Sequence, residues 1–209
     1  MQGTIHCLRV VFETAAGNPE NQDRGAVIDS SAGLVLVVAD GAGGLSGGSA
    51  AAHMAVEWVQ QRAAGLGDVN ACVSLLETMD QAVYEDKIAG ETTCALAVVT
   101  AAAVFGASVG DSGVWAIDER GFINLTESQS RKPFIGSGCV SAIPFEHKRT
   151  DGELLLLATD GLLKYTSPER ILTVCRNHGP SEVPQKLIEL VRYPSGALPD
   201  DVMVIFAYE

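Results

Sequence analysis

Residues 34–44 of the sequence, LVLVVADGAGG, place an acidic residue directly after an unbroken apolar run. The run 34–39 has the length and composition of a strand that is buried on both faces. Asp40 ends it and Gly41 follows, so we expect a carboxylate on a rigid support at the rim of a sheet. Residues 154–161, LLLLATDG, repeat this arrangement with Asp160 and Gly161. Glycine at such a position lets its backbone carbonyl approach a ligand closely.

Three more aspartates share this context. Asp111 follows the apolar residues 107–110, Asp200 directly precedes the last apolar run, and Asp23 precedes a predicted strand near Gly25. A single Asp-Gly pair is most often only a turn. Several such rims brought together form a cluster of oxygen ligands, which hard cations such as Mg²⁺ and Mn²⁺ prefer. Spacing alone therefore predicts an acidic metal site that acts on phosphate.

The apolar patterns outside these stretches predict an α+β protein of stacked sheets and flanking helices rather than a regular βαβ series. We expect strands at 5–12, 25–29, 34–39, 93–100, 104–109, 114–117, 122–125, 153–158 and 201–208. Helical spacing predicts helices at 49–62, 73–83, 168–176 and 181–191.

The composition excludes several classes of protein. Lys and Arg total 14 against 26 Asp and Glu, and the net charge of −12 argues against nucleic acid as a partner. No apolar run reaches the length of a membrane span, and the first ten residues do not resemble a signal peptide. We therefore expect no membrane partner and a cytoplasmic location. The five cysteines are odd in number and form no C-x-x-C pair, which predicts reduced core thiols.

Six segments, in one order across nearly the whole chain, resemble the metal-dependent protein serine/threonine phosphatases of the 2C type, the PPM family. They are residues 21–24 (NQDR), 38–44 (VADGAGG), 91–93 (ETT), 109–112 (VGDS), 157–162 (LATDGL) and 200–202 (DDV). The resemblance implies a four-layer α/β/β/α sandwich, with a metal centre in a cleft at one edge of the two sheets. It also implies a single phosphatase domain over residues 1–209, similar to small stand-alone bacterial members.

The resemblance further implies the roles of individual residues. Asp40 would bridge two divalent cations, Mn²⁺ or Mg²⁺, and the Gly41 carbonyl would bind one of them. Asp160 and Asp200 would complete the other cation's ligands, with Asp23 and Asp111 in supporting roles. A hydroxide bridging the cations would attack phosphoserine or phosphothreonine. By analogy, the partner is a phosphoprotein such as a kinase or a stress or signalling regulator, and the enzyme is a monomer.

The sequence departs from the family's pattern at four places, one of which is Gln22, where a Glu beside Asp23 is common. Asn18 stands where bacterial members carry an arginine that binds substrate phosphate, and Arg24, Arg131 or Lys132 are candidate replacements. Lys164 replaces an aspartate of a third metal site, which predicts two cations rather than three. The flap region around 126–152 is short for the family.

These departures leave two alternatives open. The first is a catalytically weak or inactive pseudophosphatase that binds a regulator, and Asn18, Gln22 and Lys164 motivate it. The second is a metal-dependent hydrolase of small phosphate esters, which a trimmed, open cleft would favour. Outside the matched segments, we interpret Asp80 and the pair Glu85-Asp86 as a solvated helix face.

Overall fold

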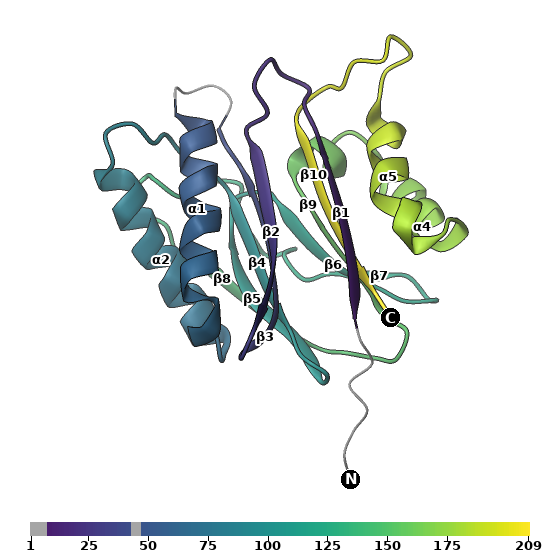
Figure 1. Cartoon of the computed structure of the whole chain (residues 1–209), viewed down its shortest axis with the longest axis horizontal. Helices are drawn as coiled ribbons and strands as arrows, with labels where there is room; N and C mark the ends of the chain where they lie inside the picture. The colour runs from purple at the N-terminus through teal and green to yellow at the C-terminus, as the bar shows by residue number, and fades with distance from the viewer. Residues whose placement is uncertain (1–7, 43–46) are drawn as a thin grey trace.

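The computed structural model describes residues 8–42 and 47–209, which form two antiparallel sheets of five strands each (Figure 1). The first sheet has the order β1 (Arg9–Ala15), β10 (Val202–Tyr208), β9 (Leu154–Ala158), β6 (Gly113–Ile117) and β7 (Phe122–Asn124). The second has the order β2 (Asp23–Ser30), β3 (Gly33–Asp40), β4 (Cys94–Val99), β5 (Ala103–Val109) and β8 (Ile143–Lys148).

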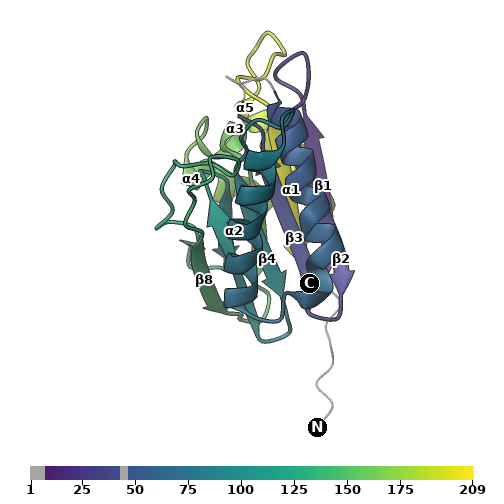
Figure 2. The same cartoon turned by 90° about the vertical axis from the view of Figure 1, so that its left-hand side faces the viewer.

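Helices cover the outer face of each sheet. The helices α1 (Gly48–Arg62) and α2 (Val69–Glu85) pack on the second sheet, as Figure 2 shows from the side. The helices α4 (Pro168–Asn177) and α5 (Val183–Val191) pack on the first sheet. A four-residue helix, α3 (Asp160–Leu163), follows β9 directly. The chain is therefore a four-layer α/β/β/α sandwich, which confirms the α+β class.

Alternation along the central strands assigns each side chain to one of the two layers beside its sheet. In β3, Val35 and Val37 pack under α1 and α2, whereas Leu36 and Val38 point into the layer between the sheets. In β10, Phe206 packs under the helices α4 and α5. Because both faces of these strands are apolar, their sequences read as continuous runs rather than as alternating patterns.

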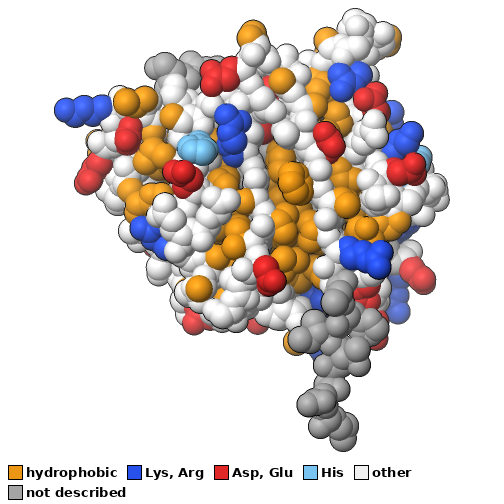
Figure 3. All heavy atoms as spheres, viewed as in Figure 1, with side chains coloured by type: hydrophobic (Ala, Val, Ile, Leu, Met, Phe, Trp, Pro, Cys, Tyr) orange, Lys and Arg blue, Asp and Glu red, His pale blue; other side chains and the backbone are white. Residues whose placement is uncertain are grey.

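The edge strands β1 and β2 lie side by side on the face seen in Figure 1 but belong to different sheets. Hydrophobic side chains form a band along this seam (Figure 3). Val10 and Val27 are only partly buried there, and Phe12 is 59% exposed.

The structure differs from the sequence-based expectations at several places, including α2, which begins at Val69 rather than at residue 73. The first strand begins at Arg9 and runs to Ala15, and part of the predicted range 5–12 lies outside the described residues. The strand β8 and the short helix α3 were not predicted. The helix expected over 181–191 starts with a 3₁₀ turn, so that α5 begins at Val183.

The interpretation of Asp80 as a solvated residue is wrong. Its side chain is 1% exposed, on the face of α2 that packs against the chain between β7 and β8. Cys72, Cys94 and Cys175 are buried free thiols, as expected, but Cys139 is exposed. No helix in the described part of the chain is long and apolar enough to cross a membrane.

Candidate active site

A cleft of about 340 Å³ lies at the end of the sandwich where β3, β5 and β9 end and β10 begins, uppermost in Figure 1. Its acidic side chains are Asp40, Glu91, Asp111, Asp160, Asp200 and Asp201. Its basic side chains are Arg131, Lys132 and Lys164. The predicted site residues Asn18, Asp40, Gly41, Asp111, Asp160 and Asp200 all line this cleft. Strand ends and loops of both sheets thus bring together residues that are up to 183 positions apart.

Asp40 ends β3 with its backbone held on both sides. Its N–H donates to Thr93 Oγ1 at 3.0 Å, and its carbonyl accepts from the Thr93 N–H at 2.8 Å and from Thr92 Oγ1 at 2.9 Å. Gly41 then passes close to the start of α1, where a Cβ would lie 2.4 Å from the backbone of Gly48. These contacts fix the Asp40 side chain at the floor of the cleft.

Asp160 is placed by the abrupt change from β9 to α3. Its successor Gly161 lies so close to β10 that a Cβ there would be 1.9 Å from the carbonyl oxygen of Asp201. One helical turn later, the Lys164 N–H donates to the Asp160 carbonyl at 2.9 Å, and Lys164 Nζ lies 3.9 Å from Asp160 Oδ2. The ammonium group of Lys164 therefore sits beside a candidate metal ligand.

Asp201 is a residue of the site whose role the sequence did not reveal. Its buried carboxylate accepts backbone N–H bonds from Gly17 at 2.8 Å, Asn18 at 3.0 Å and Gln22 at 2.8 Å. It therefore ties the loop between β1 and β2 to the start of β10. Asn18 Nδ2 in turn donates to Asp200 Oδ1 at 3.1 Å. The only sequence signal for Asp201 was its place beside Asp200; both line the cleft, but Asp201 is only 4% exposed.

Asp23 and Arg24, both predicted site residues, do not line the cleft. Asp23 lies behind Asp40, is 2% exposed, and accepts a 2.6 Å hydrogen bond from Thr159 Oγ1. The guanidinium of Arg24 is already engaged, through Nη1 with the carbonyls of Asn21 and Asp23 and through Nη2 with Ser49 Oγ. The expectation that Arg24 binds substrate is therefore not supported, since its donors hold the backbone together.

Burial and mutual repulsion raise the pKa values of the central carboxyls. Burial, followed by the charges of Asp23 and Asp160, raises the pKa of Asp40 to about 10. Burial also raises the pKa of Asp23 to about 7, against the opposing effect of the Thr159 hydrogen bond. The pKa of Asp160 is raised too, first by burial and then by the charges of Asp111 and Asp200. In the absence of cations, the raised pKa of Asp40 favours its protonated, neutral form.

This donor set fits hard divalent cations. It consists of carboxylate oxygens and the carbonyl of Gly41, and one buried oxygen, Asp23 Oδ1, has no hydrogen-bond partner among the described residues. Within residues 8–42 and 47–209, no three acidic, histidine or cysteine side chains are already arranged around a single metal position. Mg²⁺ commonly keeps several water ligands, so its binding does not require three such side chains around one ion.

The carboxylate of Asp111 is paired with an arginine side chain. Its Oδ2 accepts a 2.7 Å hydrogen bond from Arg131 Nε, in an ion pair whose side chains are 27% and 65% exposed, respectively. Arg131 comes from the chain between β7 and β8, where the described residues form no regular strand or helix. A cation supplied by the protein thus lies against the carboxylate at the end of β5.

Comparison with known proteins settles the family. The sequence profile of Protein phosphatase 2C matches residues 14–191. The chain belongs to this family. No curated protein matches the sequence significantly. As a member of the 2C family, the chain is a protein phosphatase of the serine/threonine type.

Solved phosphatases share the fold of this 2C family member. The S. agalactiae serine/threonine phosphatase is 22% identical, with a TM-score of 0.83 over 96% of this chain and 99% of that chain. The phosphatase Stp1 from Staphylococcus aureus is 21% identical, with a TM-score of 0.81 over 97% and 95% of the two chains. The catalytic domain of PstP, solved with two manganese ions, is 21% identical, with a TM-score of 0.78 over 96% and 97%.

Proposed function

We propose that this phosphatase hydrolyses phosphoserine and phosphothreonine in proteins and that it requires two divalent cations, Mn²⁺ or Mg²⁺. Asp40, the Gly41 carbonyl, Asp160 and Asp200 would hold these cations. The observation that carries the proposal is the group of buried, mutually repelling carboxyls around Asp40, whose pKa of about 10 makes full ionisation unfavourable without bound cations. The two manganese ions in the structure of PstP, a member of the same fold, support it.

When bound, the two cations would supply a bridging hydroxide as the nucleophile and neutralise charge on the phosphate as the P–O bond breaks. The chain's own residues prepare this site. Thr92 and Thr93 fix the backbone of Asp40, and Asn18 orients Asp200 through its side-chain amide. No histidine of the described residues lines the cleft, so the leaving alkoxide would take its proton from water.

Asp23 and Asp111 would act in support. Asp23 lies opposite Asp40 in the register of β2 and β3, and its negative charge would attract a cation to the same place. Asp111 is paired with Arg131, so we expect it to bind no third cation at ordinary metal concentrations.

Phosphate release from a mixed pool of phosphoserine and phosphothreonine peptides tests the proposal. We expect release with Mn²⁺ and with Mg²⁺, and none with EDTA. A parallel assay with a small aromatic phosphate ester separates a protein phosphatase from a hydrolase of small esters, because only the first should prefer peptides. Release that persists in EDTA would contradict the role of cations.

A second function, binding without hydrolysis, is favoured by one specific observation. Lys164 Nζ lies 3.9 Å from Asp160, and Arg131 is paired with Asp111, so protein cations already neutralise part of the cleft. If these cations exclude the metals, the folded protein will bind phosphopeptide but neither bind Mn²⁺ nor release phosphate. Titration calorimetry with Mn²⁺ and with phosphopeptide distinguishes the two cases.

The natural setting of the enzyme is also a proposal. We infer a phosphoprotein substrate, such as a kinase or a signalling regulator, and a monomeric, cytoplasmic enzyme whose single domain spans residues 1–209. The negative net charge of −12 supports the exclusion of nucleic acid. Light scattering of the purified chain and fractionation of cells test the monomer and the location.

A further inference from the structure

The cleft presents an electrostatic problem for any phosphorylated substrate. Six carboxylates line it, and a phosphate monoester brings close to two further negative charges. Part of this repulsion must be offset by cations that can contact the phosphate. Arg24 cannot do so because its guanidinium is engaged outside the cleft. The cationic side chains that line the cleft within the described residues are those of Arg131, Lys132 and Lys164.

Lys164 is the least suited of the three. It follows Asp160 by one helical turn, and its ammonium lies 3.9 Å from the carboxylate of Asp160. An ammonium held beside a candidate metal ligand balances that ligand's charge first. Its position therefore serves the acidic centre rather than an incoming phosphate.

Arg131 has the geometry of a phosphate receptor. Its Nε donates to Asp111 Oδ2 at 2.7 Å, which fixes the plane of the guanidinium beside the cleft. In the part of the chain that the structure describes, its two terminal nitrogens make no hydrogen bond, and the side chain is 65% exposed. A guanidinium held in this way offers two parallel donors, which match two oxygens of a phosphate.

Lys132, the next residue, adds a second cation on the same segment. Its Nζ lies 5.3 Å from the ring centroid of Phe134, which also lines the cleft. The attraction between the ammonium and the ring keeps the lysine at the rim of the cleft. Arg131 and Lys132 therefore form a cation pair that faces the acidic centre from one side.

Asp80 anchors the segment that follows this pair. Its carboxylate accepts backbone N–H bonds from Gly136 at 2.8 Å, Gly138 at 3.0 Å and Val140 at 3.1 Å. The side chain is 1% exposed, so these three donors take the place of water around a buried charge. Irregular chain without a helix or strand is thereby attached to α2.

A second attachment joins the same segment to the floor of the cleft. Ile135 forms an isolated bridge with Thr92, with N–H to carbonyl distances of 2.9 and 3.0 Å. Thr92 Oγ1 also donates to the carbonyl of Asp40. Both attachments follow Arg131 and Lys132 in the chain, so the position of this pair relative to Asp40 depends on Thr92 and Asp80.

We propose that Arg131 and Lys132 receive the phosphate of the substrate and that Asp80 is the positioning residue that holds their segment against the cleft. The proposal rests on the proposed phosphatase function, because it names how that site recognises its substrate. It places phosphate recognition on the chain between β7 and β8, whereas the loop between β1 and β2 contributes only the neutral side chains of Asn18 and Gln22 at the cleft.

The experiment compares wild type with Arg131→Ala, Lys132→Ala and the double variant, each saturated with Mn²⁺. We expect Arg131→Ala to raise KM for a phosphopeptide at least tenfold with kcat changed less than threefold, and Arg131→Lys to recover part of the loss. Arg170→Ala is the matched control, since it removes an exposed arginine of α4 that does not line the cleft. Both target side chains are exposed, so loss of the fold is not expected to obscure the result.

Asp80 is tested by a double-mutant cycle. Asp80→Asn keeps the shape of the side chain but removes its charge, and we expect KM to rise while the affinity for Mn²⁺ is unchanged. In the background of Arg131→Ala and Lys132→Ala, the same change should have no further effect on KM. An equal effect in both backgrounds would limit Asp80 to a general structural role and overturn its part of the proposal.

Direct binding separates this proposal from the phosphatase activity itself. Calorimetry measures the binding of inorganic phosphate to the Mn²⁺-loaded protein. This measurement requires no turnover. If wild type cleaves no peptide but binds phosphate at least tenfold more tightly than the double variant, the phosphate site stands and the proposed hydrolysis fails. The proposed phosphate site is wrong if the double variant binds phosphate and peptide with affinities within threefold of wild type. It is also wrong if wild type binds no phosphate.

Discussion

Asp23 and Asp40 face each other across the antiparallel pair of β2 and β3, at the last position of their register before the cleft. Asp23 is buried, and its Oδ2 is held by Thr159 from the other sheet. Two acidic side chains directly opposite each other repel unless one is protonated or a cation lies between them. This pair therefore couples the stability of the fold to protons and to metal.

The first prediction concerns the metal-free protein. The pKa values of Asp23 and Asp40 are raised from 3.8 to about 7 and about 10, so the native state keeps protons that the unfolded state has released. Stability is then greatest near pH 4 and falls as the pH rises toward 7 and beyond. Urea unfolding in EDTA at pH 5.0 and pH 8.5 measures this, and we expect a lower free energy of unfolding at pH 8.5.

Two controls accompany this measurement. Saturating Mg²⁺ should reduce the decline in the free energy of unfolding between pH 5.0 and pH 8.5, because bound cations replace the protons. In EDTA, Asp40→Asn should also reduce this decline, since the substitution removes the carboxyl with the larger pKa shift. Asp86, Asp118 and Glu169 have lowered pKa values and affect stability only below the pH range used. An increase in metal-free stability between pH 5.0 and pH 8.5 would show that the cluster is not protonated.

The second prediction concerns the candidate metal ligands. Asp40→Asn and Asp160→Asn should each lower kcat/KM by about a hundredfold or more, and each should leave the folded structure intact. Each should also stabilise the metal-free protein, because a buried carboxyl with a raised pKa is costly to keep protonated or ionised, whereas the amide is neutral. Phosphate release and thermal melting in EDTA measure the two effects.

Glu119→Gln, at an exposed position outside the cleft, provides the matched control for loss of a carboxylate. It should change neither activity nor the melting temperature. Activity retained within threefold in either aspartate variant, which is a barrier change of only about 0.65 kcal/mol, would exclude the two-cation mechanism.

The third prediction concerns the contact between Gly161 and β10. A Cβ at residue 161 would lie 1.9 Å from the carbonyl oxygen of Asp201, so Gly161→Ala must push α3 away from the strand. We expect a loss of about 1–3 kcal/mol in the free energy of unfolding, together with reduced activity because Asp160 moves with α3.

Gly121→Ala is the comparison, since a Cβ there meets no atom within 4 Å. Chemical denaturation of both variants measures the difference. Equal stability of the two variants would mean that β10 and α3 can separate without cost.

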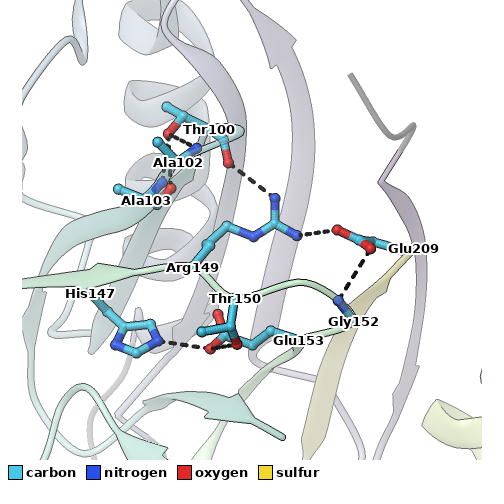
Figure 4. A network of polar contacts seen from close by, with 9 residues as sticks. All are labelled: Thr100, Ala102, Ala103, His147, Arg149, Thr150, Gly152, Glu153 and Glu209. Carbon is cyan, nitrogen blue, oxygen red and sulfur yellow. Dashed lines mark hydrogen bonds and ion pairs between the residues drawn. The ribbon is translucent and has the colours of Figure 1, made fainter. Parts of the chain in front are cut away.

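The fourth prediction concerns a polar network at the other end of β9, away from the cleft. Glu153 is 3% exposed and contacts His147 at 2.8 Å and Thr150 at 3.4 Å, beside the contacts of Arg149 and Gly152 with Glu209 (Figure 4). Glu153→Ala leaves partly buried donors without an acceptor and should cost about 1–3 kcal/mol of stability. Because Glu153 precedes β9 and Asp160 follows it, kcat should stay within threefold of wild type.

Glu146→Ala, at an exposed position of β8, should change stability by less than about 0.5 kcal/mol. Thermal and urea unfolding of the two variants provide the comparison. A loss of activity in Glu153→Ala that exceeds its loss of folded protein would instead connect this network to the cleft.

The strands that carry the site could be predicted because they are buried on both faces. An apolar run such as 34–39 needs no partner to be recognised, and the glycine after Asp40 marks its end. The strand β8 (IPFEHK) could not be recognised in this way, since it contains a proline and its exposed side chains interrupt the apolar ones, so that it has no unbroken apolar run. It is an edge strand, where such a sequence is tolerated.

Local sequence determined where each central strand ends and which acidic residue stands there, because burial on two faces and the turn preference of Asp-Gly are properties of neighbouring residues. Tertiary structure alone decided which cations reach those acids. Arg24 and Arg131 are both arginines near candidate ligands, yet one holds backbone carbonyls and the other faces the cleft. The segment carrying Arg131 has no periodicity of its own, and its neighbouring residues are held by Asp80, 56 to 60 positions earlier in the chain. Contacts over that separation form only when α2 and the second sheet have packed together.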